Sequence, residues 1–351
     1  MENQNQTPHK RRVRYKGKYP KKFEEKYKEL QPEKYKDTIE HVIQKGNTPA
    51  GMHISIMVKE VLDFLNIQPG ETGFDATLGY GGHTKAMLQC LNGKGHIYAT
   101  DVDPEESAKT KKRLAEQGFG EELLTVKLQN FCTIDEIAKE VGGFDFILAD
   151  LGVSSMQIDN PKRGFSFKTD GPLDLRLNQE TGISAARRLD TISREELAGM
   201  LYENSDEPYC EELAKAITDE IRRGNHIDTT TKLRQVIEKT LDFLPEKEKK
   251  ETIKKTCQRT FQALRIDVNH EFEVLYEFME KLPDALRPGG RVAILTFHSG
   301  EDKLVKKALK AGYKDEIYSD YAKDVIRPSA KECTQNPRAR STKMRWAIKA
   351  E

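Results

Sequence analysis

Along this chain, segments whose apolar residues recur at helical spacing alternate with short continuous apolar runs. His53–Leu65 places its apolar residues at helical spacing, and short apolar runs then alternate with further helical segments. This order predicts parallel strands joined by right-handed crossover helices. The expected strands are Thr72–Leu78, Gly95–Asp101, Leu123–Leu128 and Phe144–Asp150, and the expected helices are Thr84–Leu91, a helix opened by Pro104, and Thr133–Val141.

The next apolar run, Arg291–Phe297, follows the turn Pro288-Gly289-Gly290 after a long interval. This interval of about 140 residues is far longer than one crossover requires. It reads as helical at Ser193–Tyr202, Pro208–Arg223, Thr230–Leu244 and Phe261–Leu282, and Met344–Lys349 reads as an edge strand. The pattern therefore predicts an α/β fold, a Rossmann-like sheet interrupted by a helical insertion. The expected boundaries are a basic N-terminal extension at 1–48, a sheet domain at 49–166 and 256–351, and the insertion at 167–255.

Composition excludes several classes of protein. The 351 residues are 36% hydrophobic, which suffices for a core, and they include no apolar run of the roughly 18 residues that a membrane span needs. The N-terminus shows no signal-peptide pattern. Five scattered cysteines without a C-x-x-C pair fit reduced thiols and give structural zinc no ligand spacing. We expect a cytoplasmic protein with no membrane partner and no metal.

The near-neutral total of 58 Lys and Arg against 57 Asp and Glu conceals an asymmetry. Residues 1–50 hold 13 basic and 7 acidic residues, and Lys10–Lys22 holds eight basic residues and no acid. Aromatic residues lie among these charges, as phosphate neutralisation with base stacking requires. The alternative is a solvated tail. A second basic cluster comprises Arg327, Lys331, Arg338, Arg340, Lys343 and Arg345.

Candidate chemistry gathers where the predicted strands end. A glycine-rich turn, Gly79-Tyr80-Gly81-Gly82-His83, follows the first strand, and Asp101 ends the second, where a carboxylate can accept hydrogen bonds from a ribose. Thr84 stands where the dinucleotide motif has its third glycine. A nucleoside ligand without a diphosphate, S-adenosylmethionine, is therefore favoured over NAD. A turn that binds no ligand is the alternative.

Two further polar residues end strands at the same edge. Asp150 ends the fourth strand and His298 ends the last apolar run. Asp150 is the first candidate acceptor for a reacting amine, with capping of the next helix as the alternative. His298 is a candidate for contact with the flipped base or a phosphate, and a histidine satisfied by a neighbouring carbonyl group is an equal alternative. The acids from Asp101 to Glu106 fit the first turn of a helix better than a magnesium site.

Seven segments, in order, resemble the small-subunit rRNA (cytosine-N4)-methyltransferase H family. They are DATLGYGGHT, DLGVSSMQID, RGFSF, GPLDLRLN, RTFQALRIDVN, PGGRVAILTFHSGED and NPRARS. The resemblance implies methylation of N4 of a cytidine in the decoding centre of 16S rRNA, with the rRNA or the assembled small subunit as partner. Met156, Gly300 and Cys257-Gln258 depart from the family pattern, which is typical of a divergent branch.

Carried onto this chain, the resemblance implies a set of cofactor-binding residues, which are Gly81, Gly82, His83, Asp101, Phe131, Asp150 and Gln157. Residues expected to bind the flipped base and its phosphates are Arg163, Phe165, Phe167, Arg176, Arg338 and Arg340. The alternative for the residue 163–176 segment is a packed loop that covers the sheet edge. Methylation of another RNA base or of DNA, and a nucleotide-binding RNA-interaction protein without catalysis, are the competing functions.

Overall fold

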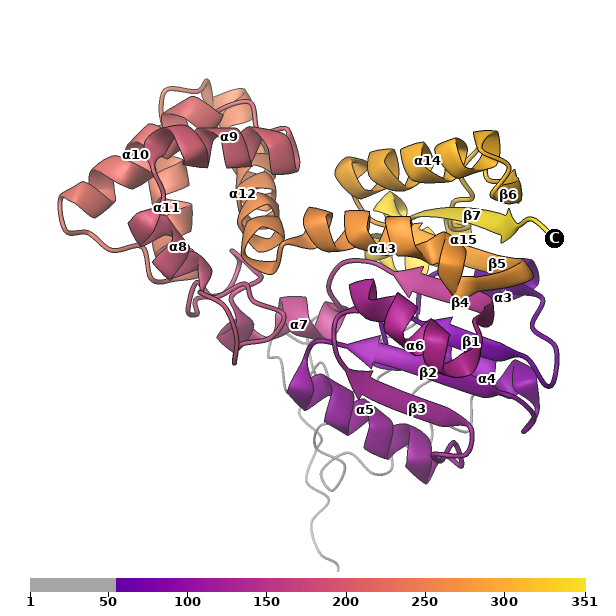
Figure 1. The fold of residues 1–351 in the computed structure, drawn as a ribbon. Helices are drawn as coiled ribbons and strands as arrows, with labels where there is room; N and C mark the ends of the chain where they lie inside the picture. Colours follow the sequence, from indigo (N-terminus) through magenta and orange to yellow (C-terminus); the bar gives the residue numbers. More distant parts are fainter. Residues whose placement is uncertain (1–54) are drawn as a thin grey trace, which may run out of the picture. The chain divides into compact units, whose positions relative to one another are not determined.

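The computed structural model describes residues 55–351, in which seven strands form one sheet between two layers of helices (Figure 1). The strand order is β3-β2-β1-β4-β5-β7-β6. β1 to β5 are parallel, and β7 runs antiparallel to both β5 and β6. The strands are β1 (Thr72–Asp75), β2 (His96–Asp101), β3 (Leu124–Leu128), β4 (Phe144–Asp150), β5 (Leu286–Thr296), β6 (Tyr318–Tyr321) and β7 (Lys343–Lys349). This is the Rossmann-like α/β fold that the alternating pattern predicted.

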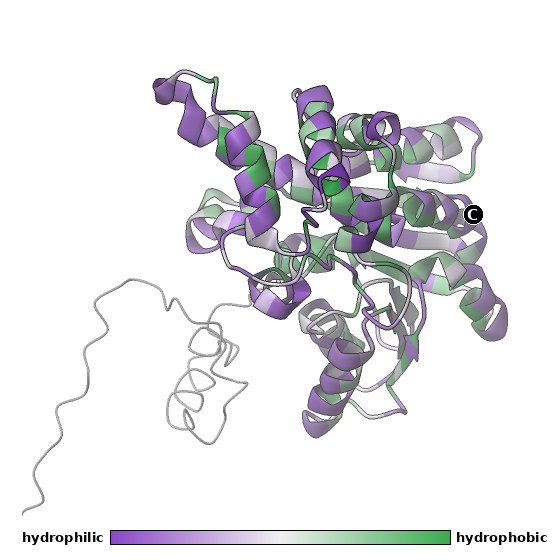
Figure 2. Ribbon diagram, turned by 90° about the vertical axis from the view of Figure 1, so that its left-hand side faces the viewer, coloured by the Kyte–Doolittle hydropathy of each residue, from purple (hydrophilic) through white to green (hydrophobic). Residues whose placement is uncertain are grey.

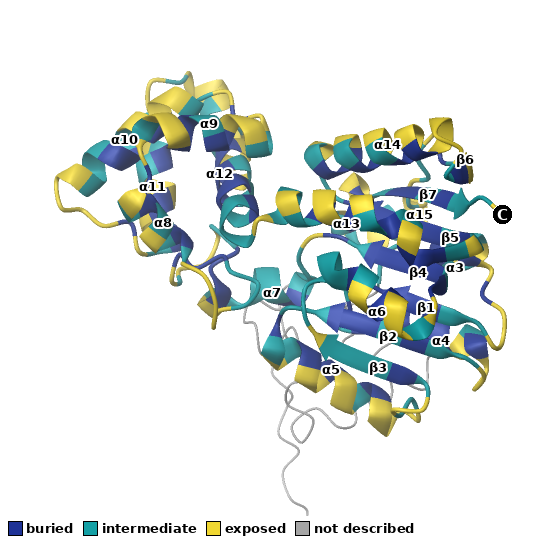
Figure 3. Cartoon of the chain, viewed as in Figure 1, coloured by how far each residue is buried: buried dark blue, intermediate teal, exposed yellow. Residues whose placement is uncertain are grey.

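Each face of the sheet has its own apolar core. One core gathers side chains from α6, α13 and α14, and the other gathers side chains from α3, α4 and α5. The helices that cover the sheet are α3 (Val58–Leu65), α4 (Gly82–Leu91), α5 (Pro104–Glu116), α6 (Ile134–Val141), α13 (Glu271–Ala285) and α14 (Ser299–Lys314). Strands β1, β4 and β5 are largely buried (Figure 3), as nearly continuous apolar sequences require.

A third core, separate from the sheet, lies within the helical segment after β4. Its helices are α8 (Ala185–Thr191), α9 (Arg194–Ser205), α10 (Cys210–Arg222), α11 (Thr230–Thr240) and α12 (Glu246–Asn269). Apolar residues of these helices turn inward and hydrophilic residues cover their outer faces (Figure 2). The Ser193 side chain accepts a hydrogen bond from Glu196 N and so caps the N-terminus of α9.

Three local predictions are wrong. Met344–Lys349 is not an edge strand, because β6 pairs with its outer side and residues 318–321 gave too short an apolar signal to be recognised. The expected helix Phe261–Leu282 is two helices, since His270 adopts the left-handed conformation (φ 52°) between α12 and α13. Pro288-Gly289-Gly290 lies inside β5, where the register with β4 shifts, and is not a separate turn.

Shorter elements complete the described chain. They are α7 (Ser155–Asp159), α15 (Ala330–Gln335) and the 3-10 turns at Phe131–Thr133, Pro161–Arg163 and Pro337–Ser341. Helix α12 runs across the boundary expected at residue 255. Within residues 55–351, no helix is both long and apolar enough to span a membrane. The predicted basic extension at 1–48 lies outside the described residues.

Candidate active site at the carboxyl edge of the sheet

The glycine loop joins β1 to α4 in a conformation that favours glycine. Gly79 and Gly81 have φ values of 47° and 76°, and Gly81 caps the N-terminus of α4. A Cβ on Gly82 would lie 2.0 Å from Ser55 Oγ, so a side chain there would require Ser55 to move. The loop therefore keeps bare backbone at the N-terminus of a helix, where N–H groups and the helix dipole face an approaching ligand.

The buried carboxylate of Asp75 holds this loop in place through hydrogen bonds. Asp75, at the end of β1, accepts hydrogen bonds from Thr84 Oγ1 at 2.6 Å and from Thr77 N at 3.0 Å. Burial raises the pKa of Asp75 above its ordinary value, against the effect of these hydrogen bonds. Thr84, which replaces the third glycine of a dinucleotide motif, is thus the residue that ties α4 to β1.

Asp101, at the end of β2, faces the same loop. Its two carboxylate oxygens accept backbone hydrogen bonds from Gly79 N at 2.8 Å and Asp103 N at 2.9 Å. Burial raises the pKa of Asp101 to about 6, although these hydrogen bonds act in the opposite direction. A carboxylate has roughly four acceptor positions, so Asp101 retains acceptor capacity for two further donors such as the hydroxyls of a ribose.

Asp150 and His83 meet in the centre of the crevice. His83 Nδ1 lies 3.4 Å from Asp150 Oδ2, and His83 Nε2 lies 2.9 Å from the carbonyl oxygen of Ile56. Burial alone would lower the pKa of His83, but the hydrogen bond and charge of Asp150 raise it overall. Asp150 Oδ1 is buried and has no hydrogen-bond partner within residues 55–351. One buried acceptor atom at this edge of the sheet therefore lacks a donor within the described residues.

Arg163 and Asp103 form a buried ion pair, which contradicts the expected role of Arg163 as a phosphate ligand. Arg163 Nη1 lies 2.6 Å from Asp103 Oδ2, and Arg163 Nη2 donates to the carbonyl oxygens of Arg176 and Leu177. Arg163 is only 6% exposed. Its guanidinium is occupied by the protein itself, so Arg163 is not a phosphate ligand but a tie between the start of α5 and the segment that leads into the insertion.

Gln157 joins the same network. Its Oε1 accepts from Ser154 N in the capping box of α7, and its Nε2 donates to Asp103 Oδ2 at 3.2 Å. Phe131 follows β3 and packs edge-on against Phe278, with ring centroids 5.2 Å apart. Contact of Gln157 and Phe131 with the cofactor remains a prediction.

Most of the residues expected to bind RNA have partners within the protein. Phe165 is buried in the helical core, which corrects its expected role as a stacking face, and Phe167 packs against Phe261. Arg176 holds both oxygens of Asp174 at 2.8 Å, and Arg338 lies 2.7 Å from Asp159 Oδ1. The 163–176 segment is thus the packed loop that the sequence analysis held as the alternative. Arg340 is exposed.

Two residues of the second basic cluster, Lys343 and Arg345, pair with an acid of the protein itself, which the sequence does not show. Asp302, in the first turn of α14, lies 2.6 Å from Arg345 Nε and 2.8 Å from Lys343 Nζ. Arg345 is 4% exposed. Lys343 and Arg345 therefore bind β7 to α14.

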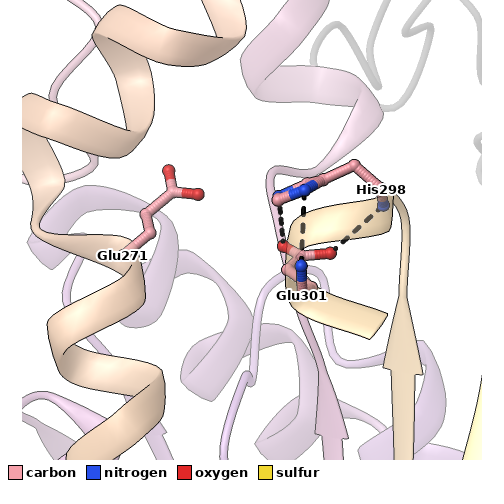
Figure 4. A group of neighbouring side chains, drawn as sticks. All are labelled: Glu271, His298 and Glu301. Atoms are coloured by element: carbon pink, nitrogen blue, oxygen red, sulfur yellow. Dashed lines mark hydrogen bonds and ion pairs between the residues drawn. The ribbon is translucent and has the colours of Figure 1, made fainter. Parts of the chain in front are cut away.

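Glu271, His298 and Glu301 form a second group at the carboxyl edge (Figure 4). One ligand atom from each lies within 4.8 Å of the others, a spacing that a metal ion can use. However, Arg265 binds both oxygens of Glu271 at 2.8 Å, and Glu301 accepts from Phe297 N at 2.8 Å. Protein donors thus already offset the charge of both carboxylates. His298 Nε2 lies 3.1 Å from Glu301 Oε1, but outside hydrogen-bond geometry.

Comparison with known proteins decides the family. Residues 50–350 match the model of the MraW methylase family. The chain belongs to the MraW methylase family. It is 85% identical over 343 residues to ribosomal RNA small subunit methyltransferase H 1 of Agathobacter rectalis, with 98% of each chain covered. A second MraW relative, ribosomal RNA small subunit methyltransferase H of Acidobacterium capsulatum, is 37% identical over 301 residues, with 85% of this chain and 98% of that one covered.

Among solved structures, the chain is similar to a SAM-dependent O-methyltransferase from Thermotoga maritima. The identity is 11%, the TM-score is 0.39, and 90% of this chain and 71% of that chain are covered. As a member of the MraW methylase family, the protein is a methyltransferase whose methyl donor is S-adenosylmethionine. The crevice fits that donor, because Asp101 has acceptor capacity for a ribose and Asp150 Oδ1 is a buried acceptor without a partner in the described chain.

The raised pKa of Asp101 gives a testable pH dependence. The ionised carboxylate accepts hydrogen bonds from ribose hydroxyls, so affinity for S-adenosylhomocysteine is expected to fall as pH drops below about 6. A free-protein pKa of about 6 predicts a dissociation constant about fourfold higher at pH 5.5 than at pH 7.5. Calorimetric titration at the two pH values measures this dissociation constant.

Asp101→Ala is expected to weaken binding by about 1–3 kcal/mol, or about 5- to 150-fold, because buried donors lose their acceptor. Asp101→Asn serves as the control for pH dependence, since His83 still titrates in that variant. Equal pH profiles in the wild type and Asp101→Asn, or unchanged affinity in Asp101→Ala, would remove Asp101 from the ribose site.

Proposed function

We propose that this protein transfers a methyl group from S-adenosylmethionine to N4 of a cytidine in the decoding centre of 16S rRNA. The relatives named as ribosomal RNA small subunit methyltransferases, at up to 85% identity, support the choice of an rRNA substrate. The observation that carries the chemistry is Asp150, whose Oδ1 is buried and without a partner in the described chain at the edge where the donor binds. An rRNA substrate implies action in the cytoplasm.

Asp150 suits an exocyclic amine as acceptor. The N4 lone pair of cytosine is delocalised into the ring, so the nitrogen is a weak nucleophile until it becomes pyramidal. A carboxylate that accepts a hydrogen bond from the amine favours the pyramidal form and stabilises the positive charge that develops on nitrogen. When bound, S-adenosylmethionine supplies a methyl group already activated by its sulfonium. The crevice then contributes mainly by aligning the two reactants.

His83 acts as a positioning residue for this carboxylate. Its imidazole is 7% exposed and lies between the Ile56 carbonyl oxygen and Asp150 Oδ2. The raised pKa of His83 favours a protonated ring, whose positive charge then lies beside Asp150 Oδ2. Oδ2 is thus committed to His83, and Oδ1 remains for the amine.

His298 is the second proposed contact with the base. It caps α14 at the end of β5, and its Nε2 is buried without a hydrogen bond in the described chain. Cysteine chemistry of the kind used for methylation at carbon is disfavoured, because burial raises the pKa of Cys132 to about 11 and that of Cys257 to about 12. The described thiols with these values are not nucleophiles at neutral pH.

Mass mapping of methylated nucleosides tests the proposal. Purified protein and S-adenosylmethionine are incubated with unmodified 16S rRNA and, separately, with small subunits assembled from it. We expect N4-methylcytidine at one position in the decoding centre. The same position should be unmodified in cells that lack the protein. A methyl group on another base, on ribose or on carbon 5 of cytosine would overturn the proposal, and so would the absence of methylation on both substrates.

A further inference from the structure

Helix α14 carries a row of lysines along its outer face. Lysines at spacings of three and four residues share one face of a helix, and all of these are exposed (Figure 3). They are Lys303, Lys306, Lys307, Lys310 and Lys314. The opposite face packs into the sheet core through Val305 and Leu309. We refer to these five residues as the lysine face.

Four of the five lysines of the lysine face form no ion pair within the described chain, although Asp315 and Glu316 follow the end of the helix. Elsewhere exposed lysines often pair with acids one turn away, as Lys109 does with Glu105 at 2.6 Å. In the lysine face, only Lys303 approaches an acid, with its Nζ 3.9 Å from Asp206 Oδ2. The two acids of α14, Glu301 and Asp302, are buried on the other side of the helix.

This arrangement has a cost for the isolated helix. Like charges one turn apart repel one another and destabilise a helix, and Lys303–Lys307, Lys306–Lys310 and Lys310–Lys314 are such pairs. An anionic partner that lies along the helix would relieve this repulsion.

The lysine face also begins at the proposed reaction site. α14 follows His298, and Leu295 near the end of β5 pairs in register with Asp150. The helix extends from the carboxyl edge of the sheet, and Lys303 and Lys314 are about 17 Å apart along its axis. A chain of phosphates bound along α14 would therefore lead to the edge where Asp150 lies.

An aromatic residue lies beside the far end of the lysine face. Tyr313 is 40% exposed, and its ring centroid is 5.0 Å from that of Tyr321. Positive charge together with an exposed aromatic ring is typical of surfaces that bind single-stranded nucleic acid, because bases stack on the ring while phosphates pair with lysines.

We propose that the lysine face of α14 binds the sugar–phosphate backbone of the rRNA strand that carries the target cytidine, with Tyr313 as a stacking platform. This proposal rests on the proposed function for the identity of the RNA. It locates the RNA surface on α14, in place of the Arg163, Lys343 and Arg345 side chains that the protein uses internally.

The test measures RNA affinity as a function of salt. The probe is a labelled single-stranded RNA with the 16S sequence around the cytidine that mass mapping identifies. In the variant Lys306→Gln/Lys307→Gln/Lys310→Gln, the slope of log affinity against log salt should fall by about 2, since each lost phosphate contact contributes roughly 0.7. Affinity near physiological salt should fall about 10- to 50-fold.

The matched control carries the same charge change elsewhere. Lys94, Lys215 and Lys247 are exposed and form no ion pair in the described chain, so Lys94→Gln/Lys215→Gln/Lys247→Gln should keep the wild-type slope. Affinity for S-adenosylhomocysteine should be unchanged in both variants. The thermal midpoint should fall in neither, and in the α14 variant it should rise slightly because the repulsion between lysines is removed. Tyr313→Leu should weaken RNA binding without changing the salt slope.

Three outcomes overturn the lysine face as an RNA surface. The first is a wild-type salt slope in the α14 variant, and the second is an equal loss of slope in the control variant. The third is an α14 variant that keeps full RNA affinity but loses binding to the assembled subunit, which would indicate a protein partner. The proposed function fails separately, if the wild-type protein forms no N4-methylcytidine whatever the slopes of the variants.

Discussion

Replacing Asp150 with asparagine lowers kcat for methyl transfer by about 10²–10³-fold, the usual effect of removing a group that stabilises developing charge. The amide is nearly isosteric with the carboxylate but neutral, so it no longer stabilises positive charge on the amine. Because Oδ2 of Asp150 contacts His83, the substitution also changes the partner of a buried imidazole. Single-turnover kinetics at saturating S-adenosylmethionine measure the effect on the chemical step.

Asp145→Asn is the matched control for this prediction. Asp145 lies on the same strand as Asp150 but at its amino end, where it pairs with Arg287. Its replacement should leave kcat within about twofold of the wild-type value, because that end of a parallel strand faces away from the crevice. An unchanged kcat in the Asp150→Asn variant would show that the carboxylate has no part in the reaction.

Replacing Arg163 with methionine is expected to reduce the free energy of unfolding by about 3–5 kcal/mol, because Asp103 keeps its charge in a buried place without its partner. Asp103 is 2% exposed and also caps α5, with hydrogen bonds from Glu105 N and Glu106 N. The loss should appear in urea denaturation followed by circular dichroism. Sensitivity to proteolysis within residues 163–177 should increase in parallel, since Arg163 also holds the carbonyl groups of that segment.

Lys109→Met provides the control on the same helix. Lys109 and Glu105 form an exposed ion pair, and exposed pairs contribute about 0–1 kcal/mol. The double variant Asp103→Asn/Arg163→Met should recover part of the lost stability, because no unpaired charge remains buried. If Arg163→Met and Lys109→Met destabilise the protein equally, the Asp103–Arg163 pair does not support the fold as argued.

The sequence predicted which polar residues lie together at the carboxyl edge of the sheet, because parallel strands bring their carboxyl ends to one edge. Asp101 and Asp150 each end a strand, and a glycine loop follows the first strand, so their proximity follows from topology alone. Thr84 marked the departure from a dinucleotide motif, and the structure adds the physical reason, which is its hydrogen bond to Asp75.

The sequence could not show which charged residues have partners inside the protein. Arg163 and Lys306 are equally basic in the sequence, yet one is buried against Asp103 and the other is exposed without an ion-pair partner in the described chain. Asp103 is sixty positions from Arg163 along the chain, so no local pattern reports their contact. The RNA surface was therefore expected partly on residues that stabilise the fold.

The amino-acid sequence by itself determined the alternation of strands and helices, the strand ends at which Asp101 and Asp150 lie, and the family. These features are local, since they depend on hydrophobic period, turn residues and motif spacing. Only the tertiary structure decided the place of β7 inside the sheet, the pairing of His83 with Asp150, and the division of basic residues between the interior and α14. Each of these depends on contacts between residues far apart in the chain, which chain folding alone brings together.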